Sequence, residues 1–162
     1  MKRTFGVFFC LGLALSANAG EKLRVIDLGS DEPVSAEAAE RGRKYTEAQE
    51  AAAKITPDEA MQFMQRLSET VDKGHAQAKT GAMDGKAIRN QAVALNKLQD
   101  EGARYRVMFA RFKSCGDASS DAAFSWQGLI GSNTAQFVEY HQKYITAATE
   151  CIKAAQLAAS KG

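Results

Sequence analysis

Thr56-Pro57-Asp58-Glu59 begins the stretch TPDEAMQFMQRLSETV (residues 56–71), which carries the clearest helix start in the sequence. Threonine at the N-cap, proline at the first helical position and glutamate three residues after the cap form a capping box. Side chains suited to a buried face then recur at steps of three and four residues: Met61, Met64, Leu67, Val71, His75 and Ala78. This spacing predicts an amphipathic helix that ends at Thr80-Gly81.

The sequence on either side of this stretch predicts further helices. We expect one over residues 35–54 with Ser35 as its N-cap, and one from Asp84 to Cys115 with Gly116 as the residue after its end. A short helix should begin at Ser119 or Ser120, and a last helix should begin at Ser132 or Asn133 and continue to about Ser160. Since few positions suit strands, the predicted fold class is all-α: a single-domain bundle of four to five helices, two or three of them long.

Two of these helices have informative inward faces. The face of the first predicted helix consists mostly of small side chains, namely Ala38, Gly42, Tyr45, Ala48, Ala52 and Ile55. The face of the helix predicted over residues 84–115 ends in Gly102, Tyr105, Phe109 and Phe112. Small side chains bury little area, so we expect the first helix to be the least stable.

The amino-terminal residues predict export. Lys2 and Arg3 precede an uncharged apolar run over residues 5–17, and Ala17-Asn18-Ala19 fits a cleavage site. The run is shorter than the roughly 20 residues that a membrane-spanning helix needs. We therefore expect a cleaved signal peptide over residues 1–19, an extended arm over 20–34, and a helical domain over 35–162 that is periplasmic or secreted and has no transmembrane segment.

Cleavage would also remove the small excess of positive charge. The full sequence has 21 basic and 19 acidic residues, and loss of Lys2 and Arg3 leaves 19 of each. Nucleic acids and anionic membranes bind net basic surfaces. We therefore expect neither to be a partner.

Two cysteines, Cys115 and Cys151, would remain in the mature chain, because Cys10 lies in the signal peptide. In an oxidising compartment such a pair forms a disulfide, and no C-x-x-C spacing favours metal ligation or redox chemistry. With Cys115 at the end of its predicted helix, the bridge should hold that helix to the last helix, around the short helix inserted between them.

The two histidines, His75 and His141, both fall on apolar helix faces and are the candidates for a metal site. The segment Tyr140-His141-Gln142-Lys143-Tyr144 is similar to the C-terminal helix of the cytochrome b562 family, periplasmic four-helix haem proteins with Met and His ligands. This resemblance implies His141 as a haem ligand, with Met61 or Met64 in the place of the methionine. Because the match covers five residues, we expect no cofactor and keep a haem or metal carrier as an alternative function.

The sequence contains no hydrolase motif and predicts a protein that is not an enzyme. The candidate partner-binding surface consists of aromatic and basic residues: Trp126, Tyr140, Arg104 and Arg111. Trp126 is expected to be exposed, because Phe124 and Leu129 on other faces of the same helix should fill the core. Exposed aromatic side chains beside basic ones are typical of binding hot spots.

These observations favour a small exported helical protein that binds another protein through its surface. Its most concrete form is an inhibitor or immunity protein that blocks a toxin or a cell-wall hydrolase. Besides the haem or metal carrier, a structural or chaperone-like envelope protein is a further alternative. The sequence leaves the identity of the partner and the oligomeric state open.

Overall fold

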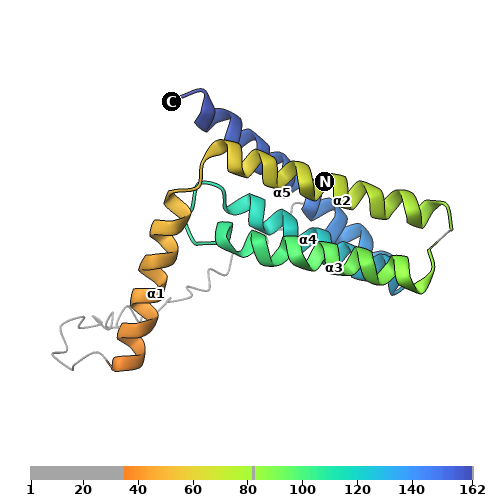
Figure 1. The fold of residues 1–162 in the computed structure, drawn as a ribbon, viewed down its shortest axis with the longest axis horizontal. Coiled ribbons are helices and arrows are strands. Elements are labelled where there is room, and N and C mark those ends of the chain that lie inside the picture. Colours follow the sequence, from red (N-terminus) through yellow and green to blue (C-terminus); the bar gives the residue numbers. More distant parts are fainter. Residues whose placement is uncertain (1–34, 82, 162) are drawn as a thin grey trace, which may run out of the picture. The chain divides into compact units, whose positions relative to one another are not determined.

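The computed structural model describes residues 35–161 apart from Ala82. The expected signal peptide and the arm over residues 20–34 lie outside this part of the chain. The elements, in chain order, are α1 (Ala36–Ala53), α2 (Pro57–Lys79), α3 (Gly85–Gly102), the 3₁₀ turn η1 (Ala103–Tyr105), α4 (Lys113–Ile130) and α5 (Thr134–Ala159) (Figure 1). The described residues contain no strand, which confirms the all-α fold class.

Four of the helices begin where their capping residues predict. The side chains of Ser35 and Asp84 accept hydrogen bonds from backbone N–H groups three residues later, at 3.2 and 2.6 Å. Asn133 does the same at the start of α5, at 3.1 Å. The capping box of α2 is complete, since Thr56 and Glu59 each bind the other's backbone N–H. These bonds satisfy donors that the first helical turn leaves without partners.

Helices α2, α3, α4 and α5 form a four-helix bundle in which neighbours along the chain pack together and α5 also packs against α2 (Figure 1). Helix α2 additionally touches α4 across the bundle. The core between these helices holds large side chains from all four of them and from the connection after α3, including Phe63, Leu67, Leu95, Tyr105, Phe112, Trp126 and Tyr144. Apolar burial on these faces is the main stabilising term of such a bundle.

The most extensive packing in the bundle is between α4 and α5. The buried face of α4 is rich in alanine, serine and glycine, which allows the two backbones to approach. A Cβ atom added at Gly128 would lie 2.5 Å from the backbone nitrogen of Phe137 on α5. Cys115 and Cys151 form the expected disulfide, with their Cα atoms 4.9 Å apart.

The predicted boundary between the third and fourth helices was wrong. Instead of one helix to Cys115, α3 ends at Gly102, residues 106–112 reverse the chain, and α4 begins at Lys113. The disulfide therefore joins α4 to α5 and does not reach back to α3. Tyr105 and Phe112 are buried at the two ends of this reversal. Their seven-residue spacing is compatible with a helix, but here the two side chains fix the ends of a turn in the core.

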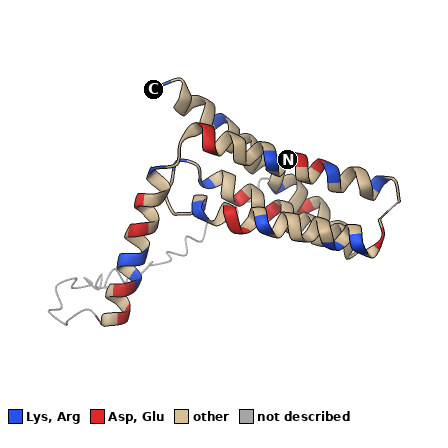
Figure 2. Ribbon diagram, in the orientation of Figure 1, with Lys and Arg blue, Asp and Glu red and all other residues tan. Residues whose placement is uncertain are grey.

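The predicted inward face of α1 is confirmed only at its C-terminal end, where Ala52 is buried and Ile55 packs against the core, whereas Tyr45 is 49% exposed. Among the described elements α1 contacts η1, but no other helix. Figure 2 shows acidic and basic residues distributed along α1. Four ion pairs at helical spacing, such as Arg43 with Glu47 at 3.0 Å, support it along its exposed surface.

Candidate functional site

The four residues expected to form one partner-binding surface do not lie together. Tyr140, near the start of α5, packs on Phe124 of α4 with ring centres 5.1 Å apart. Arg111 borders a hollow beside Leu157, near the end of α5. Seventeen residues of helix between Tyr140 and Leu157 correspond to about 26 Å. The aromatic and basic residues thus belong to different ends of the bundle.

Trp126 is 2% exposed and lies in the core, so the expectation of an exposed indole was wrong. The cause is the longer α4, which packs against both α3 and α5 and has most of its circumference covered. Phe124, expected in the core, is instead 39% exposed, whereas Leu129 packs against the core as predicted. Trp126 therefore contributes to stability and not to a recognition surface.

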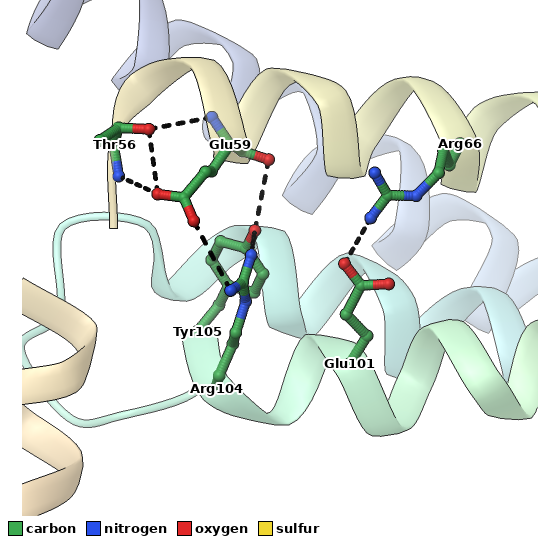
Figure 3. Close-up of polar contacts among 6 residues, drawn as sticks. All are labelled: Thr56, Glu59, Arg66, Glu101, Arg104 and Tyr105. Atoms are coloured by element: carbon green, nitrogen blue, oxygen red, sulfur yellow. Dashed lines mark hydrogen bonds and ion pairs between the residues drawn. The ribbon is translucent and has the colours of Figure 1, made fainter. Parts of the chain in front are cut away.

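Arg104 is engaged by groups of the protein itself (Figure 3). Its Nη1 lies 3.7 Å from a carboxylate oxygen of Glu59, and its Nη2 donates a hydrogen bond to the Tyr105 hydroxyl oxygen at 2.9 Å. The Tyr105 hydroxyl in turn donates to the backbone carbonyl of Glu59 at 3.3 Å. The bond to Tyr105 raises the pKa of Arg104, and burial raises the pKa of Tyr105. Arg104 therefore fastens η1 to the first turn of α2.

Figure 3 also shows the capping box at the start of α2 and an ion pair between α2 and α3. A carboxylate oxygen of Glu59 accepts from the backbone N–H of Thr56 at 2.8 Å and from its hydroxyl at 3.0 Å. These two bonds lower the pKa of Glu59, and the charge of Arg104 adds to the effect. Two turns further along α2, Arg66 forms an ion pair with Glu101 of α3. These polar groups are engaged either in the cap of α2 or in contacts between α2 and its neighbours.

The loop that reverses the chain after η1 presents the most exposed large apolar side chain of the described residues, Phe109 at 89%. The backbone N–H of Ala110 donates to the carbonyl of Val107 at 3.0 Å and closes a turn. Phe109 is the third residue of this turn and has a φ of 64°, in the left-handed region that favours glycine. The turn therefore holds a phenylalanine outward in a backbone conformation that its side chain disfavours.

Met108 and Arg111 lie next to Phe109 in this loop, and we refer to the three residues as the Phe109 surface. Met108 is 58% exposed, and its carbonyl accepts a hydrogen bond from the Gln49 side chain of α1 at 2.6 Å. Arg111 is exposed, with its guanidinium 5.9 Å from the ring centre of Phe112. Phe109 and Arg111 line a hollow together with the last residues of α1 and with Ile55, which follows that helix.

The structure brings the two histidines of the chain together. His75 of α2 and His141 of α5 have ring centres 4.9 Å apart, at an interplanar angle of 62°. Phe137 stacks on His141 at 5.4 Å, and both histidines are half-buried. Burial lowers the pKa of His75, and the adjacent His141 lowers it further, whereas Asp72 opposes the shift.

This geometry does not fit a haem between the two histidines. Trans ligation of one iron requires ring centres about 6 Å apart, given metal–nitrogen bonds of about 2 Å, and the observed separation is 4.9 Å. Met64 is fully buried and lies 11 residues before His75 on α2, which corresponds to about 16 Å of helix. Neither Met64 nor the more distant Met61 can therefore share an iron with His141. Within the described part of the chain, no group of three or more His, Cys, Asp or Glu side chains could hold a metal ion.

Sequence reasoning missed Phe109 as a surface residue. It falls in step with Tyr105 and Phe112 on a helical face, and no glycine, asparagine or proline marks the turn around it. The contact between His75 and His141 could not be predicted. The sequence places both on apolar helix faces but does not show which residues those faces pack against.

The chain shows no match to any known family model, to any curated protein or to any solved structure. None of the helices that the structure describes is both long enough and apolar enough to cross a membrane.

Proposed function

We propose that this protein is an exported, non-catalytic binding protein that recognises another protein through the Phe109 surface. The observation that carries the proposal is the combination of 89% exposure and a φ of 64° at Phe109. An exposed phenyl ring does not contribute the stability that its burial would give. The left-handed backbone conformation destabilises the fold by about 1–2 kcal/mol at a residue with a side chain. Strained residues of this kind cluster at binding and functional sites.

The chemistry of the Phe109 surface indicates the kind of partner. A projecting phenyl ring and a flexible Met108 side chain suit an apolar pocket, while Arg111 suits a carboxylate beside that pocket. Arginine and aromatic residues supply much of the binding energy in protein interfaces. The partner should therefore present a hydrophobic pocket with an acidic rim.

The expected export signal and the Cys115–Cys151 disulfide support a periplasmic or extracellular site of action. A small disulfide-linked bundle that inserts one side chain into a pocket suits an inhibitor or immunity protein. In that role Phe109 would occupy and block a cleft of a toxin or a cell-wall hydrolase.

The experiment is site-specific photo-crosslinking in the native producing cells. A photoreactive phenylalanine analogue replaces Phe109 in one strain, and Val93 of α3, which is 66% exposed, in a matched control strain. The proposal predicts a discrete adduct from position 109 that is absent from position 93. The same adducts from both positions, or none from position 109, would contradict it.

A further inference from the structure

The two histidines of the sequence are 66 positions apart, yet their rings meet across α2 and α5. Phe137 covers one face of His141, and its ring lies edge-on to His75 with centres 5.6 Å apart. Both histidines are half-buried, so each residue keeps part of its surface in contact with solvent. What the pair can bind then depends on which of the imidazole nitrogen atoms lack a hydrogen-bond partner.

One of these requirements is not met by the protein. The Nδ1 atom of His141 is buried and has no hydrogen-bond partner among the described residues. A buried polar atom without a partner is energetically unfavourable, and such groups are rare in folded proteins. A ligand bound at this nitrogen would satisfy a group that the packing leaves without a partner.

The distance between the rings fits a metal ion bound by both histidines. With metal–nitrogen bonds of about 2 Å and a bond angle near the tetrahedral value, two imidazole centres lie about 5 Å apart. The observed separation is 4.9 Å. We propose that His75 and His141 together bind one divalent transition-metal ion, Cu²⁺ or Zn²⁺, with solvent completing the coordination.

The surroundings are consistent with such an ion. Imidazole nitrogen is a preferred ligand of copper and zinc and binds them in its neutral form. Burial, the first of the effects on His75, favours that neutral form. Asp72, one helical turn before His75, is close enough for its negative charge to act on the ring, and this charge partly balances that of the ion.

Metal binding would add a second link to α5. The disulfide joins α4 to α5 at Cys151, and His141 lies ten residues earlier on α5, about 15 Å along the helix. An ion held by His75 and His141 would join α2 to α5 at that level. Because the unfolded chain separates the two histidines, the ion should bind the folded protein preferentially and raise its melting temperature.

The test is calorimetric titration of the tag-free mature protein with Cu²⁺ and with Zn²⁺, and with Mg²⁺ as the control ion. We expect one Cu²⁺ or Zn²⁺ per chain and no Mg²⁺ binding, because Mg²⁺ requires oxygen ligands. His75→Gln and His141→Gln should each raise the dissociation constant by at least about tenfold, since each removes half of the protein ligands. The exposed neighbour Gln142→Ala is the matched control and should leave it unchanged. Equal affinities in all four proteins, or no transition-metal binding, would overturn the proposal.

A second measurement on the unsubstituted protein removes the risk that a histidine variant unfolds. Diethyl pyrocarbonate modifies accessible neutral imidazoles, and mass spectrometry reports each histidine separately. Increasing Zn²⁺ should protect His75 and His141 in parallel. Protection of one histidine alone, or of neither, would show that the pair does not share an ion.

Discussion

Phe109 occupies a position at which the backbone favours glycine and the solvent favours a polar side chain. Three residues later, Phe112, directly before α4, is buried in the core. The same residue type thus has opposite roles at two neighbouring positions. The turn places Phe112 in the core, where it stabilises the fold, and leaves Phe109 exposed to solvent.

The substitution Phe109→Gly should raise the free energy of unfolding by about 1 kcal/mol, because glycine adopts a φ of 64° without strain. Urea denaturation measures the change. Phe112→Ala is the contrasting variant and should lower the same quantity by about 3–5 kcal/mol through loss of a buried ring. A destabilised Phe109→Gly protein would show that the phenyl ring has a packing role.

Glu59 gives the protein part of its sensitivity to acid. Hydrogen bonds from Thr56 hold its pKa below the ordinary value of 4.5. A carboxylate with a lowered pKa stabilises the folded state above its ordinary pKa, and that contribution disappears as the pH falls through the lowered value. The loss of stability between pH 5 and about pH 3 should therefore be smaller in Glu59→Gln than in the unsubstituted protein. Urea denaturation at several pH values measures it, and identical acid profiles would rule out this role of the capping box.

At the scale of the helices, the sequence was most informative where side chains act on their own backbone. Ser35, Thr56, Asp84 and Asn133 predict helix starts because a cap bonds to an N–H group two or three residues away. The turn at residues 106–112 has no such local signal. Its position depends on the burial of Tyr105 and Phe112 in the assembled core. Such tertiary packing cannot be derived from the spacing of apolar residues in the sequence.

The candidate sites were predictable to the same limited extent. The pairing of Cys115 with Cys151 was predicted from their number and from the expected compartment, whereas the helices that they join depended on the misplaced boundary. Trp126 was expected to be exposed and is buried, and Phe124 was expected to be buried and is exposed. The reason is that α4 packs against both α3 and α5, and the sequence of α4 alone does not show which of its faces they cover.

The approach of α4 to α5 depends on Gly128. Gly128→Ala should lower the free energy of unfolding by about 1–3 kcal/mol, because the added methyl group would meet the backbone of Phe137. The matched control is Gly42→Ala on α1, where a Cβ meets nothing within 4 Å. That control should raise the same quantity by up to about 1 kcal/mol through helix propensity. Equal effects of the two substitutions would contradict the close packing at Gly128.

At the scale of the whole molecule, the disulfide closes a loop of 36 residues in a bundle whose α4 buries mainly small side chains. Loop closure of this length stabilises a protein by roughly 3–4 kcal/mol in the chain-entropy model. Reduction, or the double substitution Cys115→Ala with Cys151→Ala, should lower the free energy of unfolding by about this amount. Urea denaturation with and without a thiol reductant measures it. A reduced protein of unchanged stability would show that packing alone holds α4 and α5 together.

The bundle as a whole supports the loop that carries Phe109. Four helices, the disulfide and the contacts of Arg104 fix the two ends of the loop, and the loop displays one strained aromatic side chain. A rigid support reduces the entropy that binding would otherwise cost.

The most direct test of this account is the affinity of the partner crosslinked at position 109 for the Phe109→Gly protein, measured together with the stability of that variant. The account predicts that the variant is more stable than the unsubstituted protein and binds its partner at least about 30-fold more weakly, as expected for a hot-spot residue. A serine substitution at the exposed control position Val93 should change neither quantity by much. Unchanged affinity in Phe109→Gly would contradict the assignment of the Phe109 surface as the binding site.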